Sequence, residues 1–147
     1  MERAATFLAT GAYVGYVPVA PGTFGSLLAL PLALALAALA LPAPAHVALL
    51  AALIAGSMAV CGRAARVLGD DDGRIVLDEI CGMLVATALV APTPWVLAAA
   101  FGFFRAFDIL KPFPVGWLDR ELKGGAGIVA DDVVAGLYAN LLVRVLT

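Results

Sequence analysis

The feature that most limits the possible folds is an apolar run near the C-terminus, residues 128–146, that contains two adjacent carboxylates. Its sequence, IVADDVVAGLYANLLVRVL, has the character of a membrane helix, yet Asp131 and Asp132 lie one turn from its start. An ionised group at membrane depth costs from ~2.5 to more than ~10 kcal/mol, so intramembrane carboxylates usually mark functional sites. The positions of the other polar residues should therefore show what these two carboxylates do.

The composition indicates a membrane protein. Hydrophobic residues make up 63% of the 147 residues and charged residues 14%, whereas soluble domains average about 45–50% and about 25%. We expect one domain, residues 1–147, folded as an all-α membrane helix bundle without a cleavable signal peptide. The net charge of -2 and the lack of a Lys/Arg-rich run indicate no nucleic-acid partner, and nothing indicates an obligate protein partner. Cys61 and Cys81 lie in apolar stretches and are expected to be buried thiols rather than a disulfide.

Turn signals divide the chain into apolar blocks of 15–19 residues, at 24–41, 47–61, 75–91, 95–110 and 128–146. These blocks are slightly shorter than the ~20 residues that span a hydrocarbon core. We therefore expect about four or five membrane-embedded helices, some of them tilted or partly submerged. Residues 4–17 are expected to add a short N-terminal helix suited to the membrane interface.

Basic residues gather on one side of this arrangement. The turns on the other side, residues 42–46 and 92–94, contain no Lys or Arg, and among the basic residues only Arg144 falls there. The positive-inside rule places the basic side in the cytoplasm. Its basic residues are Arg3, Arg63, Arg66, Arg74, Lys111, Arg120 and Lys123.

The same topology brings every unusual polar motif to the basic side. The motifs are PGTFGS (residues 21–26), Asp78-Glu79, the Arg105/Asp108/Lys111 set and Asp131-Asp132. A scatter of solvated helix ends would also give this pattern. Asp132, Gly136 and Asn140 share one face of the predicted helix, with Asp131 and Ala135 beside it. The small residues on this face favour a site instead, because small residues line the faces where membrane helices touch.

The charges of these motifs call for a cation. Five carboxylates face only two basic side chains, which leaves three negative charges in a medium of low dielectric. Either some carboxylates are protonated or metal ions lie among them, and an all-oxygen ligand set suits a hard ion, Mg²⁺ above all. A guanidinium suits a phosphate, and residues 21–26 form either an anion site at a helix N-terminus or an ordinary Ser/Thr cap. The carboxylates are Asp78, Glu79, Asp108, Asp131 and Asp132, and the cations are Arg105 and Lys111.

Competing catalytic motifs are absent from the sequence or lack their context. The single histidine, His46, falls on the opposite side, which excludes a histidine-dependent phosphatase, and neither cysteine has an Arg six positions later. Residues 70–74, DDDGR, resemble an acyl-phosphate motif but fit a solvated acidic loop better. Residues 125–130 fit a loose dinucleotide fingerprint, yet no strand precedes them.

Four blocks of the sequence resemble a known family. PGTFGS (21–26), IVLDEICG (75–82), FRAFDILKPFP (104–114) and GGAGIVADDVVAG (124–136) look like the signature blocks of phosphatidylglycerophosphatase A, in order over nearly the whole chain. The resemblance implies a bacterial inner-membrane, Mg²⁺-dependent lipid phosphatase. Such an enzyme removes the terminal phosphate of phosphatidylglycerophosphate and yields phosphatidylglycerol and phosphate. Leu77 and Phe113 replace the Trp that the family often has, which bears on packing only.

The resemblance and the residue chemistry together assign roles to the site. The metal ligands would be Asp78, Glu79, Asp131 and Asp132, and the ion would lower the pKa of a bound water for in-line attack. Arg105 and Lys111 would bind the phosphate, with Asp108 orienting Arg105 or completing the metal shell. Thr23, Gly25 and Ser26 would hold the headgroup phosphates.

Alternatives remain open at the sequence level. An aspartate nucleophile that forms an aspartyl-phosphate is as compatible with these residues as attack by water. A small cation- or proton-coupled transporter would also place carboxylates in a helix bundle, although it predicts charges at graded depths. A structural subunit with a cation-stabilised core is a further possibility.

Overall fold

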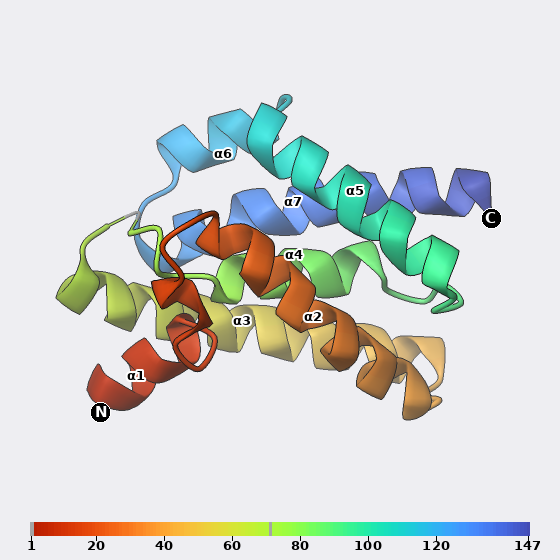
Figure 1. The fold of residues 1–147 in the computed structure, drawn as a ribbon, viewed down its shortest axis with the longest axis horizontal. Helices are drawn as coiled ribbons and strands as arrows, with labels where there is room; N and C mark the ends of the chain where they lie inside the picture. The colour runs from red at the N-terminus through yellow and green to blue at the C-terminus, as the bar shows by residue number, and fades with distance from the viewer. Residues whose placement is uncertain (1, 71) are drawn as a thin grey trace.

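The computed structural model describes residues 2–70 and 72–147, and within these ranges the chain is helical with no strand. The prediction of an all-helical bundle is thereby confirmed (Figure 1). The elements in order are α1 (Glu2–Ala9), the short 3-10 helix η1 (Val14–Tyr16), α2 (Pro21–Ala38), α3 (Ala43–Leu68), α4 (Leu77–Ala86), α5 (Pro94–Leu110), α6 (Val115–Glu121) and α7 (Gly124–Leu146).

Helices α4 and α7 run side by side through the middle of the bundle, and glycines let their backbones touch. A Cβ added to Gly136 would overlap the carbonyl oxygen of Gly82, and one added to Gly82 would lie 2.7 Å from the carbonyl oxygen of Asp132. Close backbone approach at small residues is the usual way that membrane helices associate. The contact places Asp132 directly against the first turns of α4.

Three helices, α2, α3 and α7, are long and apolar enough to cross a membrane. The predicted block 75–91 is different, because its helix α4 has only ten residues. At 1.5 Å per residue it is about 15 Å long, half the ~30 Å hydrocarbon core. Residues 80–86 are nevertheless all buried, so α4 is a short central helix enclosed by longer ones.

The early end of α4 is made possible by side chains of α7. The amide of Asn140 donates hydrogen bonds of 3.0 Å to the carbonyls of Ala86 and Ala88, and the Arg144 guanidinium donates at 2.9 Å to the carbonyl of Ala88. Backbone carbonyls that leave a helix inside an apolar medium need such partners. The two α7 side chains thus fix the far end of α4.

The N-terminal segment is less regular than the helix predicted over residues 4–17. The helix α1 ends at Ala9, and the next residues include Gly11, Ala12 and Tyr13 in left-handed backbone conformations. The carbonyl of Ala9 accepts a hydrogen bond of 2.9 Å from the amide of Val76. The segment therefore fastens the start of α4 on its outer side.

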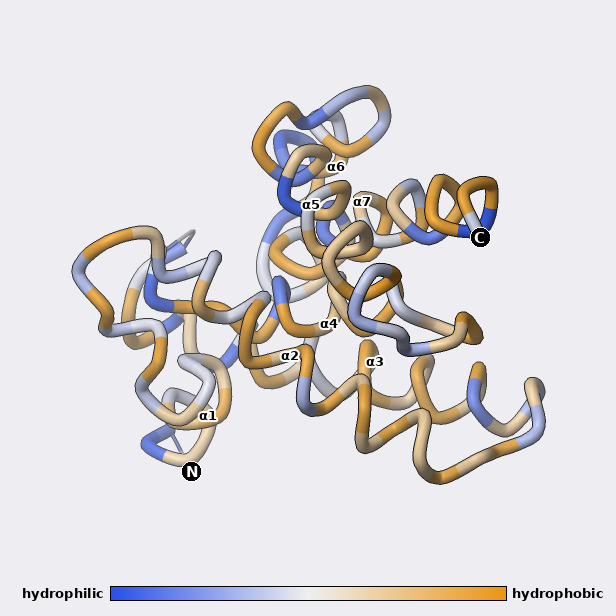
Figure 2. The backbone as a smooth tube through the Cα atoms, turned by 45° about the vertical axis from the view of Figure 1, so that its right-hand side comes forward, coloured by the Kyte–Doolittle hydropathy of each residue, from blue (hydrophilic) through white to orange (hydrophobic). Residues whose placement is uncertain are grey.

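Helix directions alternate so that the starts of α2, α4 and α7 and the ends of α3 and α5 lie at one end of the bundle, on the left of Figure 1, as the sequence predicted. Helix α6, which falls between the predicted apolar blocks 95–110 and 128–146, covers the same end. The tube in Figure 2 shows hydrophilic positions near α6 and near the starts of α4 and α7. This end contains the polar motifs.

Candidate active site

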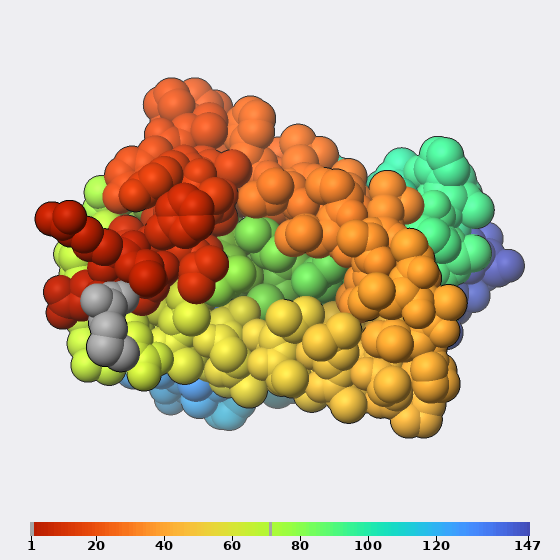
Figure 3. Space-filling model, turned by 90° about the horizontal axis from the view of Figure 1, so that it is seen from below, coloured from red at the N-terminus to blue at the C-terminus, as the bar shows by residue number. Residues whose placement is uncertain are grey.

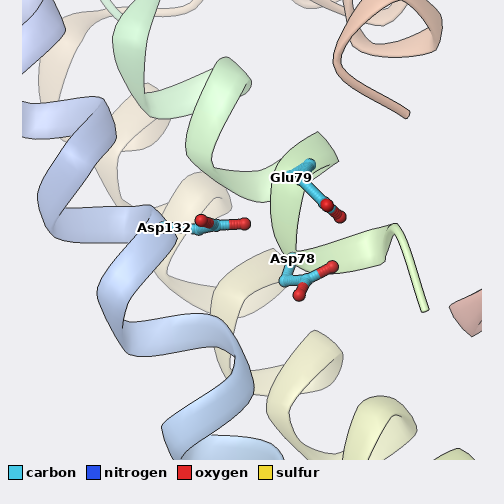
Figure 4. Close-up of side chains that lie close together, drawn as sticks. All are labelled: Asp78, Glu79 and Asp132. Atoms are coloured by element: carbon cyan, nitrogen blue, oxygen red, sulfur yellow. The ribbon is translucent and has the colours of Figure 1, made fainter. Parts of the chain in front are cut away.

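Three carboxylates from two helices form the centre of the polar end. Asp78 and Glu79 lie in the first turn of α4, and Asp132 lies in the third turn of α7. One oxygen from each lies within 4.8 Å of the others, and the three side chains point toward a common space (Figure 4). The structure thus joins two acidic motifs that are 53 residues apart in the chain.

This three-carboxylate cluster fits a hard divalent cation. At the observed separation, each pair of ionised carboxylates would repel by roughly 3–4 kcal/mol at an effective dielectric constant of 20. Within the described part of the chain, the buried atoms Oδ1 of Asp78 and Oε2 of Glu79 have no hydrogen-bond partner, and a buried unpaired acceptor costs about 1–3 kcal/mol. A cation bound by all three residues would relieve both costs, and oxygen ligands alone favour a hard ion.

A guanidinium lies beside this cluster. Arg105 Nη1 is 2.5 Å from Asp108 Oδ2, yet Nε and Nη1 have no hydrogen bond of acceptable geometry among the described residues. A Cβ added to Gly22, at the start of α2, would overlap Glu79 Oε1 and lie 3.3 Å from Arg105 Nη1. Arg105 therefore has free donors next to the carboxylates, as a phosphate-binding residue requires.

Asp131 is engaged differently from the other predicted metal ligands. Its Oδ2 accepts a hydrogen bond of 3.1 Å from Lys111 Nζ, and the same ammonium lies 2.7 Å from Asp119 Oδ1 of α6. Burial alone would lower the pKa of Lys111, but the hydrogen bonds to Asp119 and Asp131 reverse this and hold the pKa above its usual value. Lys111 therefore stays charged, and Asp131 forms an ion pair outside the three-carboxylate cluster.

A cavity of about 260 Å³ lies against the three-carboxylate cluster and the Lys111 ion pairs, and Arg105 is not among its described lining residues. Its polar wall contains the three-carboxylate cluster, Asp108, and the Lys111 group with Asp119 and Asp131. The cavity is large enough for a phosphate and its surrounding waters and small beside the ~300–1,000 Å³ of drug-sized ligand sites. It suits a single phosphorylated headgroup.

The predicted headgroup residues on α2 lie beside the cavity rather than in its described wall. The Ser26 hydroxyl is fully buried and donates a hydrogen bond of 2.9 Å to the carbonyl of Gly22. Gly25 is buried where a Cβ would lie 2.8 Å from Val76 Cβ. These two residues pack α2 against the start of α4, and Thr23 is half-buried in the same first turn. Their contact with substrate stays a prediction.

Sequence reasoning missed three charged residues that line the cavity. They are Asp70, Asp119 and Lys123. Asp119 follows Lys111 by eight positions, but the intervening Pro112 and Pro114 concealed the helix that brings it back. Asp70 belongs to the predicted acidic loop 70–74, in which Asp71 lies outside the described residues and Asp72 pairs with Arg74 at 2.6 Å.

The remaining sequence predictions concern residues away from the cavity. Cys61 and Cys81 are free and buried, as expected, and Cys81 Sγ lies 2.9 Å from the hydroxyl of Ser57. His46 is buried in α3 near its start, at the end of the bundle opposite the carboxylates. Its position agrees with the prediction that no histidine serves the site.

Comparisons with known proteins agree with the blocks identified in the sequence. A family model described as "Phosphatidylglycerophosphatase A" matches residues 7–147. The chain is 40% identical over 136 residues to "Phosphatidylglycerophosphatase A" of Escherichia coli (strain K12), a match covering 90% of this chain and 77% of the relative. It is 38% identical to the protein of the same name from Haemophilus influenzae, over 92% of this chain and 84% of that protein.

A third relative has a different name. The chain is 38% identical over 146 residues to a "Putative phosphatidylinositol-3-phosphatase" of Bacteroides thetaiotaomicron, a match covering 94% of this chain and 90% of that protein. No solved structure matches the chain. The family match over residues 7–147 and the identities near 40% show that the chain belongs to the phosphatidylglycerophosphatase A family.

Proposed function

We propose that this protein hydrolyses the terminal phosphate monoester of phosphatidylglycerophosphate and releases phosphatidylglycerol and inorganic phosphate in the cavity at the polar end of the bundle. The observation that carries the proposal is the meeting of three carboxylates with Lys111 around one small cavity, with Arg105 beside the carboxylates. The names of two relatives support the substrate. The transporter alternative finds no support in the comparisons.

In this proposal the three-carboxylate cluster binds a divalent ion, and the oxygen ligands of the cluster suit Mg²⁺. Such an ion, when bound, would neutralise phosphoryl oxygens and lower the pKa of a water molecule for in-line attack. Asp78, Glu79 and Asp132 supply the ligand oxygens within 4.8 Å of one another. Asp131 lies outside this group of ligand oxygens, and its Oδ2 accepts the hydrogen bond from Lys111, so we assign it first to Lys111.

Arg105 and Lys111 would both bind the phosphoryl group, and we assign the stabilisation of its developing charge to Arg105. The free Nε donor of Arg105 suits one phosphoryl oxygen, and Asp108 fixes the guanidinium at 2.5 Å. Lys111 would meet the phosphate from the cavity wall. Preorganised donors aimed at developing charge are usually the largest contribution to catalysis in such sites.

The location of the cavity fits a lipid substrate. Helices α2 and α7 are long and apolar enough to cross a membrane, and both begin at the polar end. A phosphate on a lipid headgroup would lie at this level while the acyl chains remain in the bilayer. We propose the bacterial inner membrane and a cytoplasmic orientation, because the basic residues gather at the same end.

Phosphate release from lipid tests the proposal. The detergent-solubilised protein is given phosphatidylglycerophosphate with Mg²⁺ or with EDTA, beside the variants Asp132→Asn and Asp72→Asn. We expect release only with Mg²⁺, a loss of at least about 100-fold in kcat for Asp132→Asn, and normal activity for Asp72→Asn, whose ion pair with Arg74 lies away from the cavity wall. No release by the wild type, or activity unchanged by EDTA and by Asp132→Asn, would refute it.

A parallel assay addresses the substrate and the nucleophile. The third relative's name makes phosphatidylinositol 3-phosphate the comparison lipid, and we expect it to be the poorer substrate. In a single turnover in oxygen-18 water, direct attack by water places the label in the released phosphate. An aspartyl-phosphate opened by water at phosphorus would give the same label, so rapid quenching and mass analysis of the enzyme for a phosphoryl adduct on an aspartate distinguish the two routes.

A further inference from the structure

Lys111 is held in an unusually fixed position at the edge of the cavity. It follows the last residue of α5 and adopts a left-handed backbone conformation, with φ 45° and ψ 56°. Few residues other than Gly and Asn accept this conformation, since the Cβ then approaches the following carbonyl. The surrounding structure therefore holds the backbone of Lys111 in this conformation and so fixes the direction in which its side chain leaves the backbone.

Helix α6 packs against the Lys111 backbone and helps to hold it in place. A Cβ added to Gly116 would lie 2.7 Å from the Lys111 carbonyl oxygen and 3.3 Å from its Cβ. The two backbones are thus in contact, and no larger residue fits at position 116 without moving α6. The same helix presents Asp119 to the end of the Lys111 side chain.

The ammonium group of Lys111 has two carboxylate partners on different helices. Its Nζ lies 2.7 Å from Asp119 Oδ1 on α6 and 3.1 Å from Asp131 Oδ2 on α7. An ammonium has three N–H donors, so two are used and one is left. All three residues line the cavity, so the remaining donor is available to a ligand there.

We propose that Asp119 is a positioning residue for phosphate binding: together with Asp131 it orients the Lys111 ammonium so that the third N–H meets the substrate phosphate. This inference rests on the proposed function and deepens it. Asp119 does not touch the phosphate in this scheme. It restricts a flexible four-carbon side chain, and fixed donors bind with less loss of conformational entropy.

The alternative role of Asp119 is that of an ordinary surface ion pair. Its side chain is 36% exposed, and such pairs contribute little to stability. The chain offers a matched comparison in Asp72, which pairs with Arg74 at 2.6 Å and is not part of the described cavity wall. If Asp119 only adds a surface charge pair, then the variants Asp119→Asn and Asp72→Asn should behave alike.

Steady-state kinetics on the lipid substrate separate the two roles. For Asp119→Asn we expect KM to rise about fivefold with kcat nearly unchanged, since a partly exposed ion pair is lost and the phosphate contact it supports exists in both ground and transition states. Asp119→Glu should restore at least half of the wild-type kcat/KM. Asp72→Asn should leave both constants unchanged. A fall in kcat alone, or equal effects of the two asparagine variants, would overturn the inference.

A double-mutant cycle tests whether Asp119 acts through Lys111. In a Lys111→Gln background, Asp119→Asn should cost less than twofold, because the group that it positions is gone. A full fivefold further loss would overturn the inference. Thermal unfolding of each variant verifies folding, and should Lys111→Gln fail to fold, the comparison of Asp119→Asn with Asp119→Glu still decides.

Binding of inorganic phosphate gives a readout independent of turnover. Titration calorimetry with Mg²⁺ present should show about fivefold weaker phosphate binding by Asp119→Asn than by the wild type and by Asp72→Asn. Equal binding by all three would overturn the inference. A wild type that binds phosphate but does not release it from lipid would refute the proposed function alone, while the titration would still test Asp119.

Discussion

If the three-carboxylate cluster holds a divalent ion as proposed, thermal stability should depend on that ion, and this can be measured without turnover. Each pair among Asp78, Glu79 and Asp132 lies within 4.8 Å, so full ionisation would cost roughly 3–4 kcal/mol per pair at an effective dielectric constant of 20. A metal at 100 times its Kd adds about 2.7 kcal/mol of stability. At about 2–4 °C per kcal/mol for a chain of this size, we expect the Tm to rise by about 5–10 °C.

The variant Asp132→Asn should change this response in two opposite directions. It removes two of the three carboxylate pairs, so the metal-free variant should unfold at a higher temperature than the metal-free wild type. It also removes one ligand, and a loss of at least tenfold in affinity should reduce the metal-induced rise in Tm to about half or less. Asp72→Asn, which changes an acidic residue outside the cluster, should respond to metal as the wild type does.

The assay is thermal unfolding of the detergent-solubilised protein in EDTA and across a series of Mg²⁺ concentrations. A wild-type Tm that does not respond to Mg²⁺, Mn²⁺ or Ca²⁺ would contradict the assignment of the cluster as a metal site. An undiminished metal response in Asp132→Asn would show that the ion binds elsewhere. Either result would leave the fold intact and remove the metal from the proposed mechanism.

Two further predictions concern packing around α4. Gly82→Ala should lower the free energy of unfolding by about 1–3 kcal/mol or more and reduce activity, since the added Cβ meets the backbone of Asp132 and the ring of Phe104; Gly56→Ala, where a Cβ meets nothing within 4 Å, should not destabilise. Asn140→Leu should cost about 1–3 kcal/mol by thermal unfolding, because the Ala86 carbonyl loses the Asn140 donor and the Ala88 carbonyl keeps only that of Arg144. Unchanged unfolding of Gly82→Ala or of Asn140→Leu would contradict this packing.

The meeting of distant polar motifs could be predicted from the sequence because it follows from topology. Once the apolar blocks are taken to cross alternately, Asp78, Glu79, Arg105 and Asp132 fall at the same end. Gly136 lies on the same face of α7 as Asp132, which predicts that this face turns toward the bundle. The structure confirms that Glu79 and Asp132 share one cluster. Hydrophobic periodicity and small-residue positions contain this information.

What could not be predicted depends on short elements and on side-chain pairing. Helix α6 has seven residues, too few for a periodic pattern, so Asp119 was not associated with the site. The end of α4 at Ala86 is set by hydrogen bonds from Asn140, 54 residues away. The pairing of Asp131 with Lys111 depends on the left-handed turn that follows α5, and no local signal separates Asp131 from its neighbour Asp132.

The early end of α4 has a consequence for the integrity of the bilayer. Beyond the carboxylates, the side chains of α4 are packed inside the bundle, and Met83 and Ala86 have no solvent exposure. A phosphate that reached the cluster would therefore meet packed apolar side chains along α4, and it would leave by the side from which it entered. In the proposed orientation, phosphate chemistry at the polar end would therefore open no path for ions across the membrane.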